Sequence, residues 1–421
     1  MSTKNNSVNM SRISLYESFV VIVLFFCALL NYLRTNHNVS IGQEARSDFK
    51  CLQWRLGEKT YIRNTSKYIT GINLPNIVQK VPITVKYDVG SIYPIRSYGE
   101  LGNDAIIPSI SEIKGNISNF EAFYMELKDV FVNHEGLFLY NDTFYPIDCD
   151  CHYTFCLRNH NSEEAFPSKF NYVQIDDLVV ITHEYGYFFA HFMMDFFPNF
   201  LVMPPEILKK SKVLITHNAG FILDGLRILG FDINNVLYSS NGFAYYAKRL
   251  YTVLPIICTK FNYHLLLNMR HIMTQKYQFD KTPAVEFIIY NRVGGFRSID
   301  NFEAVSNGIK QKYPQFPWKN IEIPHSLVDQ FRMFNTFKVL VAMHGAALAN
   351  SIFMQPGSGI VEVQVNRWVT NYLWLSSYAQ LHHVVCRNSN VKWRDQSTNV
   401  LDVDVMIKTV EVLLKEMNLL S

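Results

Sequence analysis

The chain has 421 residues, of which 18% are charged and 48% hydrophobic, and its formal net charge is +3. This composition excludes a disordered chain, and a near-neutral charge without a dense Lys/Arg stripe argues against nucleic acid as a partner. The length exceeds that of one compact core, so we expect two domains of ordinary size plus an extension.

The first predicted element is a membrane span at residues 13–33, after a short tail at residues 1–12. The segment is apolar over nearly the 20 residues that a helix needs to cross a bilayer. A cleaved signal peptide is the alternative, but the residues after Ala28 offer no small-x-small cleavage site. Two basic residues precede the span and favour a cytosolic N-terminus. We therefore expect a signal anchor, with the rest of the chain in the lumen of the secretory pathway.

Sequons and cysteines are compatible with a lumenal location. The sequons, which are candidates for N-glycosylation although chance could supply several of them, are Asn38, Asn64, Asn116 and Asn141. Seven cysteines include Cys27 within the span. The other six form an even set compatible with disulfides, namely Cys51, Cys149, Cys151, Cys156, Cys258 and Cys386. A metal site at residues 148–156 is the alternative, but the segment lacks the usual zinc spacing.

A polar, irregular stem is predicted at residues 34–70, followed by an N-terminal domain at residues 71–255. Its first part holds short β-like runs near residues 76–87 and 135–147, broken by Pro, Gly and Asn. From Val173 onward, buried strands alternate with helices, which is typical of a parallel α/β layer. We expect strands at residues 176–182, 212–217 and 235–240, and helices at residues 187–201 and 219–230, the second ended by Gly230.

The alternation restarts after a transitional stretch around residues 254–282 and predicts a C-terminal domain at residues 256–403. We expect strands at residues 285–292, 319–324, 338–343 and 359–365, and helices at residues 300–313, 326–335 and 345–354. Asp300 and Glu303 have the spacing of a capping box at the start of one helix. Residues 404–421 are predicted to form a packing helix, with one apolar face made of Met406, Val410, Leu413 and Met417. Two successive α/β units with a crevice between them are the simplest architecture.

A strand-to-helix junction in the second unit is a candidate anion site, because such folds bind ligands at the carboxyl ends of their parallel strands. His344 and Gly345 follow a predicted strand, and the amides of Ala346 and Ala347 open the next helix. Free amides at the positive end of a helix dipole attract phosphate. A packed corner with a core histidine is the alternative.

Three further residues are candidates for the same site. Arg292 and Arg297 flank a Gly-Gly turn after a strand, so both guanidinium groups could neutralise one diphosphate, although solvated surface arginines are the commoner outcome. Glu362 is the lone charge in an apolar strand and needs a partner if it is buried. A ribose hydroxyl of a bound nucleotide or a neighbouring arginine would be a suitable partner for its carboxylate.

The first unit offers a candidate general base. His191 and Asp195 stand four residues apart on an otherwise apolar helix, so they share one face. A carboxylate bonded to one imidazole nitrogen fixes the tautomer and raises the basicity of the other nitrogen. A histidine on an apolar helix is, taken alone, more often structural.

Segments carrying these residues resemble glycosyltransferase family 61, in the same order and at similar spacing. The segments are residues 187–200, 290–301 and 326–363, and the resemblance is strongest around His344, where His-Gly-Ala is followed by Pro-Gly-Ser-x-x-x-Glu. The family includes plant xylan-decorating transferases and animal N-acetylglucosaminyltransferases. Two departures exist: the region before Val173 does not align, and Met and Phe replace Arg or Trp around the His191 helix.

The resemblance implies a GT-B fold of two Rossmann-like domains with a cleft between them, and an inverting transfer from a UDP-sugar, most often of GlcNAc or a pentose. His191 and Asp195 would act on an acceptor hydroxyl of a glycan or glycoprotein. The donor diphosphate would meet Arg292, Arg297, His344, Gly345, Ala346 and Ala347, and the nucleoside would meet Glu362.

No metal is required by this arrangement, and a Mn²⁺ dependence through the Asp-x-Asp strings at residues 148–150 or 402–404 is not favoured. The expected location is the Golgi or endoplasmic reticulum membrane, as a single-pass type II protein. An inactive carbohydrate- or nucleotide-binding relative of the same fold is the alternative, whereas a cytosolic dehydrogenase would need a Gly-x-Gly-x-x-Gly turn that the chain lacks.

Overall fold

The computed structural model describes most of the chain from residue 58 onward. The described residues are 58–62, 67–68, 77–82, 91–98, 107–118, 123–133, 138–140, 143–145, 169–181, 186–215, 219–238, 243–254, 263–292, 297–364, 369–387 and 399–421. Every described element belongs to one compact unit within residues 56–421. The predicted membrane span at residues 13–33 lies outside the described residues. Within them, none of the helices combines the length and apolar character that a membrane crossing requires.

The first sheet is mixed, with a parallel centre and antiparallel strands at one side. Its order is β10-β9-β8-β11-β5-β6-β7-β2, with β1 paired to β8 and β3 paired to β5. Strands β8 to β11 run parallel through the pairs β10–β9, β9–β8 and β8–β11, whereas β5 is antiparallel to β11. The strands are β1 (Glu58–Ile62), β2 (Lys67–Tyr68), β3 (Ile77–Pro82), β5 (Phe123–Val132), β6 (Phe138–Tyr140), β7 (Thr143–Tyr145), β8 (Lys169–Val180), β9 (Lys212–Ile215), β10 (Val236–Tyr238) and β11 (Phe243–Leu254).

Helices cover one face of this first sheet. Alternate strand residues such as Val179 and Val213 join an apolar cluster with helical residues, while Leu178 and Leu214 point into a second cluster made only of described strand residues. The helices near this sheet are α6 (Phe189–His191), η2 (Phe192–Phe196), α7 (Phe197–Phe200), α8 (Pro205–Lys210), α9 (Gly220–Ile228) and η3 (Ile233–Asn235). A further helix, α3 (Ile110–Ser118), contributes Ile113 to the same apolar cluster. Among the described residues, the first sheet therefore has helices packed on one face and only strand residues in the cluster on the other.

The second sheet is parallel throughout and has the expected doubly wound form. Its order is β13-β12-β14-β15-β16-β4, and each of its pairs is parallel. The strands are β4 (Arg96–Tyr98), β12 (Glu286–Tyr290), β13 (Trp318–Asn320), β14 (Phe337–Met343), β15 (Gly359–Gln364) and β16 (His382–Arg387). The helices are α10 (Tyr263–Tyr277), η4 (Phe279–Lys281), α11 (Phe302–Lys312), α12 (Leu327–Asn335), η5 (Ala346–Phe353), α13 (Asn371–Tyr378) and α14 (Val403–Glu416).

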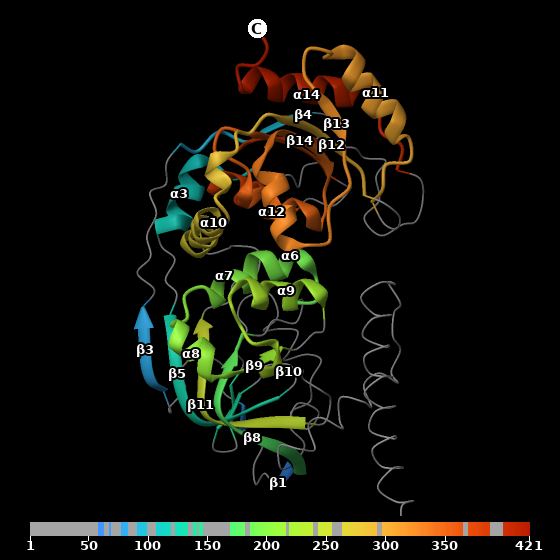
Figure 1. Ribbon diagram of the computed structural model, residues 1–421. Coiled ribbons are helices and arrows are strands. Elements are labelled where there is room, and N and C mark those ends of the chain that lie inside the picture. Colours follow the sequence, from blue (N-terminus) through green and yellow to red (C-terminus); the bar gives the residue numbers. More distant parts are fainter. Residues whose placement is uncertain are drawn as a thin grey trace, which may run out of the picture. The chain divides into compact units, whose positions relative to one another are not determined.

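Both faces of the second sheet carry helices. On one face Val339 and Val361 pack against residues of α11 and α14, and on the other Leu340 packs in the cluster that contains α10, α12, η5 and α13. Figure 1 shows α11 and α14 on one side of this sheet and α10 and α12 on the other. Short β4 comes from the N-terminal region, predicted as part of residues 71–255, yet it pairs with β16 of this sheet. The β16 edge is thus covered by a segment about 290 residues away in the chain.

The predicted packing helix at the C-terminus is present as α14. Met406, Val410 and Leu413 are buried, and Asp402 caps the helix by accepting a hydrogen bond from Val405 N. Close packing explains Gly359, where an added Cβ would lie 2.8 Å from Leu413 and would also meet Met417.

The capping box predicted at Asp300 and Glu303 is wrong. Asn301 precedes α11 without a side-chain cap, and Asp300 instead forms two hydrogen bonds with Asn399, accepting from its amide at 2.8 Å and donating its own amide at 3.1 Å. The Asp300 carboxylate therefore binds Asn399, about 100 residues away, and not the first turn of α11.

Cysteines provide one further correction. Cys386 is buried and is a free thiol, so it does not belong to the expected disulfide set. The other five cysteines of that set, like Asn38, Asn64 and Asn141, lie outside the described residues. Asn116 falls within α3.

Candidate functional site

The junction between β14 and η5 forms the centre of the site. His344 extends the sheet by donating its amide to Val363 O at 2.9 Å, and Gly345 starts the helix from an extended conformation. The expected helix is a 3₁₀ helix of eight residues, Ala346–Phe353. Gly345, Ala346 and Ala347 are partly exposed, whereas the next six residues are buried. The backbone amides at the start of the helix therefore lie at its partly exposed end, which an anion site requires.

Gly345 is not required by the protein's own packing. Its φ of −179° is open to any residue, and an added Cβ would find only Met343 O within 4 Å, at 3.7 Å. The space beside this glycine is therefore open, in contrast to Gly359 on the same sheet. A side chain at this position would therefore meet no obstacle among the described residues.

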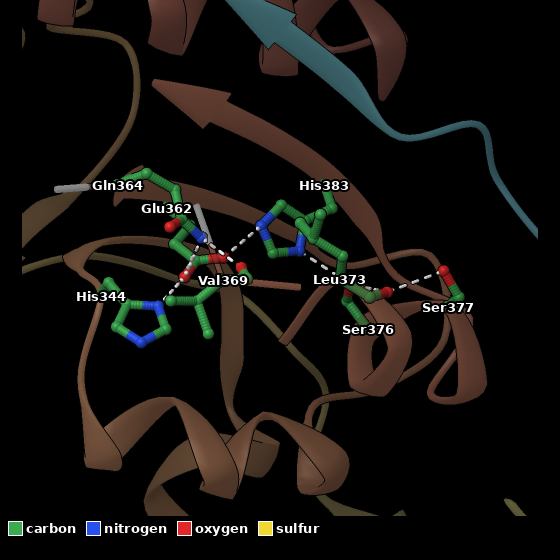
Figure 2. Close-up of polar contacts among 8 residues, drawn as sticks. All are labelled: His344, Glu362, Gln364, Val369, Leu373, Ser376, Ser377 and His383. Atoms are coloured by element: carbon green, nitrogen blue, oxygen red, sulfur yellow. Dashed lines mark hydrogen bonds and ion pairs between the residues drawn. The ribbon is translucent and has the colours of Figure 1, made fainter. Parts of the chain in front are cut away.

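Behind the junction lies a buried polar network centred on Glu362 (Figure 2). His344 Nδ1 donates to Glu362 Oε1 at 2.5 Å, and Gln364 Nε2 donates to the same oxygen at 2.8 Å. The other carboxylate oxygen, Oε2, lies 3.1 Å from His383 Nε2 as an ion-pair contact. Ser376 Oγ is 2.7 Å from His383 Nδ1 and fixes the far side of that ring. The network therefore holds His344 by its Nδ1 atom and directs the Nε2 edge of the ring away from Glu362.

Glu362 is a support for His344 rather than the ribose contact that the sequence predicted. The side chains of Glu362 and His383 have no exposed surface, and both Glu362 oxygens face protein partners. Burial on its own would raise the pKa of Glu362, but His344 and His383 outweigh it and hold the pKa at about 2. The carboxylate is therefore ionised at neutral pH and out of reach of a substrate.

Arg297 links the two predicted motifs. Its guanidinium donates to His344 O at 3.2 Å across 47 residues of sequence. The residue adopts a left-handed φ of +67°, which is uncommon outside glycine and is often found where a side chain must be aimed at a site. Burial and the positive charge of Arg292 both lower the pKa of Arg297, which places the two guanidinium groups within electrostatic range of each other. The structure therefore brings Arg297 to His344, with Arg292 within electrostatic range of Arg297.

The candidate base lies on a helix with an irregular centre. A π-helical segment, η2, interrupts the helix that runs through α6 and α7, and Pro198 follows it. Proline cannot donate a backbone hydrogen bond, so the ladder must be rearranged near it. Asn199 Nδ2 donates to Asp195 O and satisfies a carbonyl there. The sequence predicted one regular helix and missed this feature.

His191 and Asp195 form the expected pair. His191 Nδ1 is 2.7 Å from Asp195 Oδ2, with 21% of the histidine side chain exposed and none of the aspartate side chain. Burial raises the pKa of Asp195 to about 6, and its hydrogen bond to His191 only partly offsets this. Asp195 therefore holds the His191 ring by its Nδ1 atom, and part of the imidazole is accessible.

The two halves of the site are in contact. Helix α6, which carries His191, contacts η5 at the anion junction. Phe197 of α7 also approaches Phe331 of α12, with 6.4 Å between ring centroids. The structure therefore brings together the predicted base pair and the predicted anion residues, although they are about 150 residues apart in sequence.

An exposed aromatic pair lies beside His191. Tyr187 and Phe188 are 46% and 48% exposed and their ring centroids are 4.1 Å apart. Phe188 lies 6.4 Å from the His191 ring. Large exposed aromatic side chains at a polar site provide flat apolar surface for a ligand.

Three residues of the site were not predicted: Gln364, His383 and Tyr372. His383 follows His382 in a strand, and only strand alternation distinguishes the buried ring from its neighbour, which stacks on Tyr93. Within the described ranges, no group of three or more His, Cys, Asp or Glu side chains has the arrangement of a metal site. Of the predicted Asp-x-Asp strings, residues 148–150 are outside the described residues, and Asp402 caps α14.

Comparison with known proteins agrees with these elements. Residues 189–361 match the model of the family described as Glycosyltransferase 61. The matched range begins at α6 and ends within β15, so it contains His191, Asp195, Arg292, Arg297 and His344. A search of curated proteins gives no match to the chain.

Proposed function

Because residues 189–361 form a Glycosyltransferase 61 domain, we propose that the chain is an inverting glycosyltransferase that moves a sugar from a UDP-sugar to a hydroxyl of a glycan or glycoprotein. GlcNAc or a pentose is the proposed sugar. The single observation that carries the proposal is the hydrogen bond from Arg297 to His344 O, because it unites the arginine motif with the anion junction. Contact between α6 and η5 adds the candidate base to the same site.

In the proposed donor site, the diphosphate binds at the start of η5. The amides of Ala346 and Ala347, the His344 Nε2 atom and the guanidinium groups of Arg292 and Arg297 supply hydrogen bonds and positive charge. These groups are held before the substrate arrives, because Glu362 fixes the His344 ring and His344 O accepts from Arg297. Preorganised donors of this kind stabilise the charge that develops on a leaving group.

In the proposed acceptor site, His191 is the general base and Asp195 orients it. Nδ1–H of His191 donates to Asp195, and Nε2 takes the proton of the acceptor hydroxyl. The acceptor oxygen forms a bond to the anomeric carbon as the bond from that carbon to the phosphate oxygen breaks. The bonding electrons pass to the diphosphate, and attack from the opposite face inverts the anomeric centre. Tyr187 and Phe188 offer the acceptor sugar an apolar surface beside the base.

We further propose that the reaction needs no metal, since fixed cations and amides supply the charge that Mn²⁺ would otherwise provide. The proposed location is the Golgi or endoplasmic reticulum membrane, with residues 13–33 as the signal anchor. The first proposal rests on the cationic side chains and backbone amides of the diphosphate site, and the second rests on the sequence of residues 13–33.

The test is a donor panel with full-length chain purified in detergent. UDP release is measured from UDP-GlcNAc, UDP-xylose, UDP-arabinose and UDP-galactose, with and without glycan or glycopeptide acceptors, and with EDTA in a parallel series. The proposal expects release from one donor that rises with acceptor and falls about 10²–10³-fold in Arg292→Ala and His344→Ala. UDP binding without release from any donor would instead identify an inactive binding protein, and loss of release in EDTA would refute the metal-free mechanism.

A further inference from the structure

Tyr372 occupies a position that the mechanism so far does not use. It lies in the first turn of α13, only 4% of its surface is exposed, and its ring centroid is 5.0 Å from that of His344. Helix α13 also contacts η5, which opens the anion junction. The side chain is therefore buried directly beside the proposed diphosphate site, and beyond the end of the family match at residue 361.

The hydroxyl of Tyr372 forms no hydrogen bond within the described part of the chain, and it is not among the fully buried polar atoms there that lack a partner. It therefore keeps some accessible surface, although the rest of the side chain is buried. The hydroxyl of Tyr245, in contrast, donates to Tyr238 O at 2.9 Å. Packing cannot be the reason for the hydroxyl, since phenylalanine would fill the same space. An accessible hydroxyl on an otherwise buried ring is a hydrogen-bond donor open to a ligand oxygen.

Charged residues from three segments act on the Tyr372 hydroxyl. Burial and the negative charge of Glu362 raise the pKa of Tyr372 far above its usual range, with Asp195 contributing in the same direction. Arg297 and Arg292 act in the opposite direction and are the cations in range of the hydroxyl. The phenol is therefore neutral at physiological pH, so it can donate a hydrogen bond but cannot serve as a base. An anion held by the two arginines would lie within reach of this donor.

We propose that Tyr372 is a further donor-site residue whose hydroxyl donates a hydrogen bond to the diphosphate of the bound nucleotide. The inference rests on the proposed function, because it assigns a ligand contact within the same site. His383 has a different role, because it contacts Glu362, which in turn holds the His344 ring. No ligand contact is proposed for His383. Since the hydroxyl has no protein partner, its removal is expected to change binding without changing folding.

The test compares Tyr372→Phe with wild type in the full-length chain, with calorimetric titration of UDP and a denaturant unfolding curve for each protein. Loss of a hydrogen bond to a charged group predicts UDP affinity about 10- to 100-fold weaker, with the unfolding midpoint unchanged. Tyr245→Phe is the matched control, because its hydroxyl has a protein partner far from the site. The control is expected to unfold at lower denaturant and to bind UDP like wild type.

Each outcome separates the two proposals. UDP affinity that is equal in Tyr372→Phe and wild type would overturn the assignment of Tyr372 and leave the proposed function in place. A lower unfolding midpoint in Tyr372→Phe would also overturn it, by revealing a structural role for the hydroxyl. If wild type itself bound no UDP, both the donor site and the role of Tyr372 would be refuted.

Discussion

Two buried carboxylates in this molecule have opposite acid–base behaviour. Asp195 on the π-helical segment η2 has a pKa raised by burial to about 6, while Glu362 on β15 has a pKa lowered by its partners to about 2. Neither side chain has exposed surface. Asp195 has one histidine to offset burial, whereas Glu362 has two histidines and a glutamine.

Burial with one histidine partner thus leaves a carboxyl that titrates near neutral pH, whereas burial with two histidines fixes a negative charge. The Asp195 region is poised near neutral pH and its histidine is partly exposed, which suits proton transfer to and from a substrate. The Glu362 carboxylate is ionised and has no exposed surface. It therefore suits the fixed positioning of His344 in the proposed anion site. The following predictions change one region at a time.

The largest effect is expected from His191→Ala in the first region. Removing the proposed base should lower kcat by about 10²–10⁴-fold, because general base catalysis contributes that much. UDP affinity should stay near the wild-type value, since His191 faces the acceptor. His271→Ala, an exposed histidine on α10, is the control and should keep normal turnover. Normal turnover in His191→Ala would remove the first region from the mechanism.

Glu362→Leu should be the most damaging change to folding in the second region. Removal of the carboxylate leaves His344, His383 and Gln364 buried without their shared partner, and breaking a buried ion pair costs about 3–5 kcal/mol. The free energy of unfolding, from denaturant curves, measures this. Asp195→Asn should cost less, since it keeps a hydrogen-bonding side chain beside His191. A smaller loss in Glu362→Leu than in Asp195→Asn would contradict the comparison.

The two carboxylates should also give opposite pH dependence of stability. For Asp195, the folded pKa of about 6 exceeds the ordinary value of 3.8, so its stability contribution is present below about pH 4 and is lost as the pH rises to about 6. For Glu362, the folded pKa of about 2 lies below 4.5, so its contribution is present above about pH 4.5 and is lost as the pH falls.

Denaturant unfolding curves recorded at several pH values, for wild type, Asp195→Asn and Glu362→Gln, measure how the free energy of unfolding changes with pH. Each substitution should remove a slope of about 1.4 kcal/mol per pH unit, in its own window and with opposite sign. A slope of the same sign for both carboxylates would show that one of the two environments is wrongly assigned.

A pair of glycines tests the second region at a smaller scale. Gly359→Ala should cost about 1–3 kcal/mol of stability, because the new Cβ overlaps Leu413 and Met417 of the chain's C-terminal part. Gly345→Ala should leave stability within about 0.5 kcal/mol, because only Met343 O is near, but should weaken UDP binding. Equal UDP affinity in Gly345→Ala and wild type would mean that no ligand approaches this glycine.

Local patterns in the sequence predicted much of the second sheet and the junction at His344. Alternation of apolar strands and amphipathic helices predicted β12, β14, β15, α12 and α14, and the carboxyl-end rule predicted the approach of Arg297 to His344. Hydrophobic periodicity and position at the carboxyl end of a strand predicted these features, because each depends on residues close together in the sequence.

Features that depend on distant partners were missed or wrong. Asp300 has a capping spacing but pairs with Asn399, and Glu362 was given a substrate contact because His383 lies in a strand that periodicity did not predict. Strand β11 and helices α10 and α13 were also not predicted. The π-helical turn at η2 was missed since the apolar pattern there reads equally well as a regular helix.

Hydrogen–deuterium exchange with and without UDP tests the central claim most directly, because the proposed diphosphate site is made partly of backbone amides. The account predicts that UDP slows exchange at the start of η5, in peptides covering residues 345–348, and leaves the strand pair β5–β6 unchanged. Protection confined to other segments, with residues 345–348 exchanging at the same rate in both samples, would contradict it.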